Sequence, residues 1–580
     1  MFFLTVFTLV ASVPSFGETV EKRLKWIHTS DLHSSFFAFD YLKNRPIQGG
    51  LSAVYAYTDS LRRTWGDDLI LTDGGDVLQG QPISYYYNFV DTKSTHLLAL
   101  MMNRMGYVAA CIGNHDIETG HPVYDRWRRQ LNFPLLGANV VDLRTGKPYL
   151  QPYVVVERQG LKIAVLGMIT PAIPNWLPAH LWSGLRFDDI LKTARRWVPL
   201  IMEKEKPDLL VGLFHCGLDG GIQTEAYIEN ATLQVAREVP EFNAIFYGHD
   251  HVPHAEIIKR PDGSQCAVLG PASSGGRVCE LDIKLTLNQD SVTAIVLEPH
   301  TVEMTMGQSQ VAKAFECQFA SQLDKVENWV NEDICRFTAP FVESESFFGP
   351  SAFMDIIHAV QLNLTKADIS LASPLSFDNR IDSGRVTVRD MFSLYKYENS
   401  LYVMRLKGHE IKNLLEMSYG MWVNQMQSPD DHLLLFGNKQ QQARRRGLKE
   451  NYYNFDSAAG LKYVVDVTKP KGERVKISKM SDNRPFEMDA WYKVAVNAYR
   501  ANGGGDLLTK GAGIPIDVLP SRVISCGMYD MRYFLIHYLR EKKELSPFII
   551  SRWHFEPREW VEAAASRDSL LLFGEPNSVL

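Results

Sequence analysis

Residues that could bind metal ions stand together in the stretch 111–116, which reads Cys-Ile-Gly-Asn-His-Asp. The run before it, 107–110, is apolar and predicts a buried strand. An amide, an imidazole and a carboxylate are costly to bury, so they usually lie where a strand ends and a loop can direct them into a site. Taken alone, Gly-Asn-His-Asp could also be a tight turn with a polar cap.

Four other apolar runs end in the same way. Each is followed by Asp or His: Asp31 and His33 after 24–30, Asp76 after 69–73, His215 after 209–214, and His249 and His251 after 244–247. Open α/β sheets place their sites at the carboxyl ends of strands, so we expect these side chains and Asn114 to meet. Carboxylate, amide and imidazole ligands without thiolate suit Zn, Mn or Fe. The coincidence of five strand ends favours a metal site over unrelated structural residues.

Length and composition indicate a globular protein of at least two domains. The chain has 580 residues, more than one hydrophobic core usually supports. Its hydrophobic content of 45% and charged content of 22% are ordinary. A net charge of -6 gives no basic surplus, so polymeric nucleic acid is not expected as a partner.

The amino terminus predicts export. Residues 1–13 are apolar but too few to span a bilayer, and Ser15 and Gly17 are small residues at the -3 and -1 positions of a cleavage site before Glu18. We interpret 1–17 as a secretory signal peptide, although it lacks Lys and Arg; the alternative is a short retained membrane anchor. No later stretch predicts a transmembrane helix, so we expect a periplasmic or secreted protein.

Cysteine is too rare in this chain for disulfides to be its framework. There are seven cysteines, an odd number that leaves at least one free thiol. Cys266 and Cys279 flank an expected hairpin and could pair in an oxidising compartment. Cys111 and Cys216 adjoin the candidate site but have the character of small packing residues.

Strand and helix patterns alternate from 24 to 303, which predicts a largely parallel α/β domain covered by helices. Helical spacing follows at 304–336, and we interpret it as a linker helix. A second domain is expected over 337–550, with a helix at 351–364 and strands near 368–372, 401–408, 460–467 and 492–497. No element is predicted for the tail, 551–580.

The five blocks, D-x-H, G-D, G-N-H-D, H and G-H-x-H in this order, resemble those of the calcineurin-like metallophosphoesterases. The second half narrows the resemblance to the 5'-nucleotidase and 2',3'-cyclic-nucleotide 2'-phosphodiesterase family. This resemblance implies an N-terminal four-layer αββα sandwich, a C-terminal α+β 5'-nucleotidase-type domain, and two divalent ions (Zn, Mn, Fe or Co). It makes Asp76 the bridging ligand, with Asp31, His33 and His251 on one ion and Asn114, His215 and His249 on the other.

The resemblance also implies catalytic residues beside the ions. His115 would stabilise the transition state and help the leaving oxygen depart, and Glu118 would hold its ring. Glu118 stands where the family commonly has Asp, and the alternative for it is a solvated residue at a helix start.

Substrate residues are expected in the second domain. Within 452–456, Phe455 matches the aromatic on which family members stack a base, and the alternative is a core residue in an alternating strand. In the glycine-rich run 497–506, the resemblance implies that Tyr499 and Asn502 are further substrate-binding residues. Arg380 would bind the nucleotide, although 373–379 departs from the family's Gly-Gly-Gly-Ile-Arg, and Leu507 stands where many 5'-nucleotidases have an aromatic.

We therefore expect an exported phosphoesterase in which a hydroxide bridging two ions attacks a nucleotide or another small phosphoester. The substrate would be a 5'-nucleotide, or a 2',3'-cyclic nucleotide that is opened and then dephosphorylated. Two alternatives are a nucleotide-sugar pyrophosphatase and a nucleotide-binding surface protein without catalysis.

Overall fold

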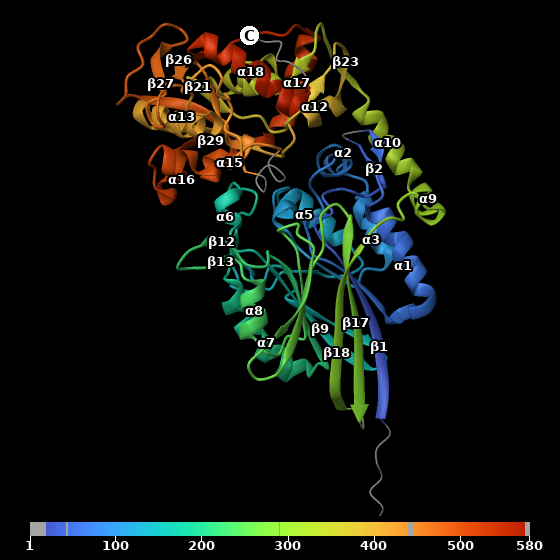
Figure 1. Cartoon of the computed structure of the whole chain (residues 1–580). Coiled ribbons are helices and arrows are strands. Elements are labelled where there is room, and N and C mark those ends of the chain that lie inside the picture. Colours follow the sequence, from blue (N-terminus) through green and yellow to red (C-terminus); the bar gives the residue numbers. More distant parts are fainter. Residues whose placement is uncertain (1–18, 42–43, 289–290, 439–445, 575–580) are drawn as a thin grey trace, which may run out of the picture.

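The computed structural model describes residues 19–41, 44–288, 291–438 and 446–574, and these form two domains (Figure 1). The expected signal peptide, 1–17, lies outside the described residues. Within the described ranges, no helix has the length and apolar character that crossing a membrane requires.

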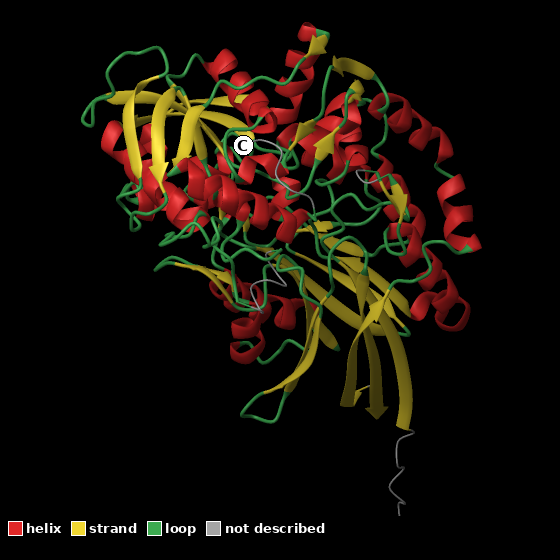
Figure 2. Ribbon diagram, turned by 45° about the horizontal axis from the view of Figure 1, so that its top comes forward, coloured by secondary structure: helices red, strands yellow, loops and turns green. Residues whose placement is uncertain are grey.

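The N-terminal domain contains two six-stranded sheets. The first has the order β18-β17-β1-β4-β5-β6, and β1, β4, β5 and β6 run parallel. Its strands are β1 (Thr19–Thr29), β4 (Leu69–Asp73), β5 (Ala109–Cys111), β6 (Leu135–Leu136), β17 (Arg277–Asn288) and β18 (Ser291–Glu303). The long strands β1, β17 and β18 extend past the rest of the domain (Figures 1 and 2).

The second sheet has the order β15-β16-β14-β11-β9-β8, and its four central strands run parallel. Its strands are β8 (Tyr153–Arg158), β9 (Leu161–Ile169), β11 (Leu209–His215), β14 (Ala244–Tyr247), β15 (His254–Lys259) and β16 (Gln265–Gly270). Central strands such as β11 are buried along their whole length, as their continuous apolar sequences require.

The two sheets pack face to face with helices outside them. Trp26 on β1 stacks on Phe246 of β14 with 5.3 Å between ring centroids, inside an apolar cluster drawn from both sheets. Helices α1 (Leu51–Trp65), α3 (Leu97–Met105) and α5 (His121–Gln130) cover the first sheet, and α7 (Ile190–Glu205) and α8 (Thr232–Glu238) cover the second. The four-layer αββα sandwich is confirmed.

The expected pairing of Cys266 with Cys279 is wrong. All seven cysteines are free. Cys266 lies on β16 of the second sheet, in the core beneath α7 and α8, whereas Cys279 lies on β17 of the first sheet, in the core between the sheets. The two strands belong to different sheets, so they do not form the hairpin on which the pairing depended.

Two consecutive helices, α9 (Gln310–Cys317) and α10 (Ala320–Val330), lead to the C-terminal domain. They lie within 304–336, where the sequence predicted a single linker helix. The five-stranded sheet of that domain has the order β25-β21-β28-β24-β29. Its strands are β21 (Ile369–Ala372), β24 (Ser400–Lys407), β25 (Ser457–Ala459), β28 (Trp491–Asn497) and β29 (Val523–Asp530). Helix α11 (Ala352–Thr365), whose start Ser351 caps, packs on β21, and α13 (Gly408–Trp422) packs on β24.

Residues 551–574, for which no element was predicted, contribute to the C-terminal domain. Strand β31 (Arg552–Glu556) pairs in parallel with β26 (Leu461–Asp466), which also pairs with β27 (Val475–Met480). Helix α18 (Arg558–Phe573) follows, and its Val561 and Ala564 are buried in the same core.

A buried charged cluster joins the two domains. The guanidinium of Arg532, on α17 (Met531–Lys542), is 0% exposed and pairs with Glu398 at 2.9 Å and Asp530 at 3.0 Å. It also lies 4.9 Å from the ring centroid of Tyr85, on α2 (Pro82–Tyr85) of the N-terminal domain, whose hydroxyl donates to Asp530 at 3.0 Å. The hydroxyl of Tyr85 thus gives this buried cluster a direct hydrogen bond between the two domains.

Candidate metal centre

Five strands of the N-terminal domain bring seven polar side chains to one place. Asp31 and His33 follow β1, Asp76 follows β4, and Asn114 begins α4 (Asn114–Ile117) after β5. His215 is the last residue of β11, and His249 and His251 follow β14. The parallel strands of both sheets end at the same edge, which is why residues from 31 to 251 can meet.

The backbone at the site is shaped to aim these side chains. Asp31, His33, Asp76, His249 and His251 all have positive φ, between 43° and 84°, a region that non-glycine residues rarely adopt. A Cβ on Gly113 would lie 2.1 Å from Oδ1 of Asp76, so only glycine fits there. Such strain persists when the surrounding fold enforces it, and it concentrates at functional sites.

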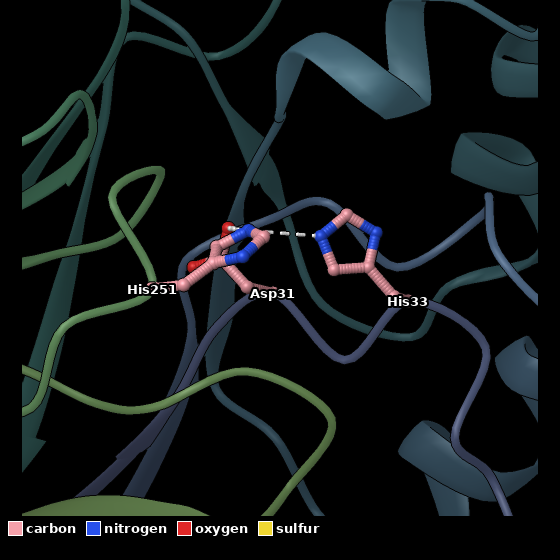
Figure 3. Close-up of side chains that lie close together, drawn as sticks. All are labelled: Asp31, His33 and His251. Atoms are coloured by element: carbon pink, nitrogen blue, oxygen red, sulfur yellow. Dashed lines mark hydrogen bonds and ion pairs between the residues drawn. The ribbon is translucent and has the colours of Figure 1, made fainter. Parts of the chain in front are cut away.

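The side chains form two donor groups. In the first, Asp31, His33 and His251 converge (Figure 3), with Nε2 of His251 3.0 Å from Nε2 of His33 and 3.2 Å from Oδ1 of Asp31. In the second, Asp76, His215 and His249 converge around Asn114, whose Oδ1 lies 3.0 Å from His215 and 2.9 Å from His249. The backbone N–H of His33 donates to the backbone oxygen of Asp76 at 3.0 Å, so the groups adjoin.

The donor atoms suit metal ions. Nδ1 of His215 lies 2.7 Å from the carbonyl oxygen of Gly74 and carries a proton, because a carbonyl oxygen only accepts. Its Nε2 then faces Oδ2 of Asp76 at 3.1 Å. His33 has the same arrangement, because its Nδ1 lies 3.3 Å from the carbonyl oxygen of Gln79 and its Nε2 faces Nε2 of His251. Lone pairs at such distances repel unless a proton or a metal cation lies between them, so both groups fit divalent ions.

Electrostatics keep the carboxylates charged. Burial raises the pKa of Asp76, but His215 and His115 beside it lower that pKa well below its usual range. Burial likewise raises the pKa of Asp31, and its hydrogen bond with His251 lowers the pKa below the usual range. Both carboxylates therefore stay ionised at neutral pH, as ligands of cations must.

His115 and Glu118 form a pair beside the donor groups. Nδ1 of His115 lies 2.5 Å from Oε2 of Glu118, and its ring lies 5.3 Å from that of His33. Burial lowers the pKa of His115, but the charges of Asp76 and Glu118 outweigh it and raise the pKa to about 10. Glu118 thus contacts the imidazole instead of standing in solvent at a helix start.

Sequence reasoning missed Asp116, a fully buried carboxylate directly after His115. It accepts four backbone N–H bonds of 2.8–3.0 Å, from Gly113, Asp76, Val77 and Leu78. Asp116 therefore ties the loop after β4 to the loop after β5. Its place inside the Gly-Asn-His-Asp block was the available indication.

Phe455 does not offer a face to a base in this structure, which favours the alternative that it is a core residue. Its side chain is 0% exposed and stacks on Trp422 with 5.6 Å between centroids and 5° between planes. The residue follows the short helix η4 (Tyr452–Asn454) and turns inward, whereas Tyr453 stays partly exposed.

The other expected substrate residues take different positions. Tyr499 is partly exposed and lies edge-to-face with Tyr453, 6.2 Å between centroids, and Gly504 is close against its ring. Nδ2 of Asn502 donates to the carbonyl oxygen of Trp176 at 2.9 Å, so it joins the domains. Arg380 is half exposed on β22 (Arg380–Ile381) and pairs with Asp382 at 2.6 Å.

Trp176 places the glycine-rich loop of the C-terminal domain near the donor groups. It ends α6 (Ile173–Trp176), and its ring lies 5.5 Å from that of His249. Figure 1 shows α6 facing α15 (Ala498–Ala501), which precedes Asn502.

Comparison with known families matches both domains. Residues 24–253 match the calcineurin-like phosphoesterases, and residues 333–510 match the 5'-nucleotidase C-terminal domain.

Among curated proteins, a 2',3'-cyclic-nucleotide 2'-phosphodiesterase/3'-nucleotidase of Yersinia enterocolitica is 27% identical, over 86% of this chain and 83% of its own. A 5'-nucleotidase of Vibrio cholerae is 30% identical over 40% of each chain.

Solved structures agree in fold. A candidate 5'-nucleotidase from Staphylococcus aureus, solved with α-ketoglutarate, aligns with a TM-score of 0.70 and 22% identity, over 92% of this chain and 100% of its own. A 5'-nucleotidase precursor from Thermus thermophilus aligns with a TM-score of 0.59 and 22% identity, over 92% of this chain and 99% of its own.

Proposed function

Since the chain belongs to the calcineurin-like phosphoesterases that carry a 5'-nucleotidase C-terminal domain, and is a hydrolase of phosphoric esters, we propose that it hydrolyses nucleotides with two divalent ions. The observation that carries this proposal is the pair of adjoining donor groups. Each offers carboxylate and imidazole donors, and together they suit two ions better than one.

The ions, when bound, would polarise a phosphoryl oxygen and supply a nucleophile at neutral pH. Asp76 lies in the second donor group, and its backbone oxygen accepts from His33 of the first, so we assign it the bridging position. The seven proposed ligands are Asp31, His33, Asp76, Asn114, His215, His249 and His251.

His115 performs the proton transfer in this proposal. Glu118 holds Nδ1 at 2.5 Å, which leaves Nε2 to face the substrate. A protonated ring there would stabilise negative charge on the phosphoryl group and donate its proton to the leaving oxygen.

The base would be held by the C-terminal domain. Tyr453 and Tyr499 are partly exposed, and the glycine-rich run after Tyr499 contacts Trp176 beside His249. A nucleotide could therefore reach from the tyrosines to the ions. Aromatic faces suit any base, so we propose broad base tolerance.

Cyclic and 3'-nucleotides are the first substrates to test. The Yersinia relative of that activity matches over 86% of this chain and 83% of its own. Export is also part of the proposal, and it rests on the composition of residues 1–17.

Chromatographic analysis of products tests the proposal. The substrates are 2',3'-cyclic, 3'- and 5'-nucleotides, nucleotide sugars and p-nitrophenyl phosphate, each with Mn, Zn, Co or Mg. We expect metal-dependent hydrolysis of cyclic and 3'-nucleotides. Cleavage of nucleotide sugars alone would indicate a pyrophosphatase, and nucleotide binding without hydrolysis under every metal would indicate a binding protein.

A further inference from the structure

A carboxylate outside the two donor groups faces one of the proposed ligands. Oε1 of Glu229 lies 3.0 Å from Nε2 of His249, and the Glu229 side chain is 11% exposed. The opposite ring nitrogen, Nδ1, lies 2.9 Å from Oδ1 of Asn114 in the second donor group. An ionised carboxylate only accepts, so Nε2 of His249 carries the proton and Nδ1 presents its lone pair to that group.

We propose that Glu229 is a positioning residue that fixes the tautomer and direction of His249, and so sets the affinity of the second donor group for its ion. The inference rests on the proposed function. Histidine ligands of metals commonly donate their outer N–H to a carboxylate, which makes the ring a better ligand.

The local fold is built around this carboxylate. Glu229 lies on β13 (Ile228–Asn230), which pairs with β12 (Gly220–Gln223) in a two-stranded hairpin. The backbone N–H of Ile222 donates to Oε2 of Glu229 at 2.6 Å. Gly221 has φ of +74°, and a Cβ there would lie 2.6 Å from Oε2, so β12 can close over the carboxylate only with glycine at this position.

The hairpin is anchored to the strand that carries another proposed ligand. Oδ1 of Asn230 accepts from the backbone N–H of Gly217 at 3.0 Å, two residues after His215 at the end of β11. Glu229 therefore has a fixed position relative to the second donor group. The backbone N–H of Ile222 holds one oxygen of its carboxylate, and the other oxygen faces Nε2 of His249.

The ring of His249 is also enclosed by α6. Trp176 lies 5.5 Å from it with 32° between the planes. The same helix is tied to the hairpin, because Nδ2 of Asn175 donates to the hydroxyl of Tyr227 at 2.6 Å. Trp176 limits movement of the ring, and Glu229 determines which nitrogen faces the donor group.

Metal titration of the full-length, chelator-stripped protein tests this role. Free Mn²⁺ is followed by electron paramagnetic resonance in wild type, Glu229→Ala, Glu229→Gln and the control Glu225→Gln, which changes an exposed acid on the same hairpin. We expect Glu229→Ala to weaken one of two Mn²⁺ affinities by about 10- to 100-fold. Glu229→Gln, which can still accept from Nε2, should lose less, and the control should bind as wild type.

A second readout separates positioning from a structural role. At saturating Mn²⁺ the kcat of Glu229→Ala should return toward that of wild type, because the ion is then bound despite the weaker ligand. Unchanged affinities in both Glu229 variants would overturn the inference alone. An equal loss at both ions together with a lower Tm would overturn it in favour of a folding role. A wild-type protein that binds none of Mn²⁺, Zn²⁺, Co²⁺ and Mg²⁺ would overturn the proposed function as well.

Discussion

Replacing Phe455 with alanine should destabilise the C-terminal domain and leave nucleotide recognition intact. The ring is fully buried, stacks on Trp422 at 5.6 Å and meets Phe347 edge-on at 6.4 Å. Removing a buried phenylalanine lowers the unfolding free energy by about 3–5 kcal/mol. We expect the upper part of this range, because Trp422 is itself held by Trp553 and Phe555, each 5.8 Å away, and cannot move to fill the cavity.

Tyr453→Ala is the matched comparison for Phe455→Ala, because Tyr453 is also an aromatic residue, lies two positions before Phe455 and is partly exposed. If Tyr453 stacks on the base, its loss removes about 1–3 kcal/mol, a five- to 150-fold rise in KM for nucleotides. Hydrolysis of p-nitrophenyl phosphate, which has no base, should hardly change. Urea unfolding followed by circular dichroism gives the stability of both variants, and steady-state kinetics on both substrates give the recognition.

The reverse pattern would contradict these roles of Phe455 and Tyr453. A Phe455→Ala variant of wild-type stability with a raised KM for nucleotides alone would mean that Phe455 contacts the base. Equal KM values for Tyr453→Ala and wild type would place the base elsewhere, with Tyr499 the next residue to test.

Three further substitutions probe the metal centre. Asp76→Asn should lower kcat by about 10³-fold or more, since the ions supply several kcal/mol of transition-state stabilisation, and should reduce bound metal on elemental analysis. His115→Ala should lower kcat by about 10²- to 10⁴-fold with the metal content kept, and loss of metal would contradict its role as a non-ligand. Asp116→Ala should cost about 3 kcal/mol or more of unfolding free energy, because buried backbone donors lose their acceptor; calorimetry showing wild-type stability would contradict this.

The candidate metal centre was predictable because the strands that deliver it are buried. Short continuous apolar runs such as 209–214 are typical of interior strands, and the carboxyl ends of parallel strands lie at one edge of a sheet. The residues that follow, among them His215 and His249, are brought together as expected. The positive φ of five of these residues could not be predicted, because it is imposed by contacts between loops distant in sequence.

Residues whose role depends on long-range packing were less predictable. Phe455 and Tyr453 are both aromatics near a strand, and only the fold determines that one is buried against Trp422 and the other stays partly exposed. Strand β31 was missed because its partner, β26, lies far away in sequence. Glu229 belongs to no motif, and its position beside His249 arises from a hairpin that closes on its carboxylate.

Two ions should share this site, and the stoichiometry of metal binding is the decisive measurement. Chelator-stripped protein is titrated with Mn²⁺ or Zn²⁺, and bound metal and hydrolysis of a 2',3'-cyclic nucleotide are measured at each step. We expect binding of two ions per chain, with activity that appears only as the second binds. Full activity with one bound ion, or with none, would contradict it.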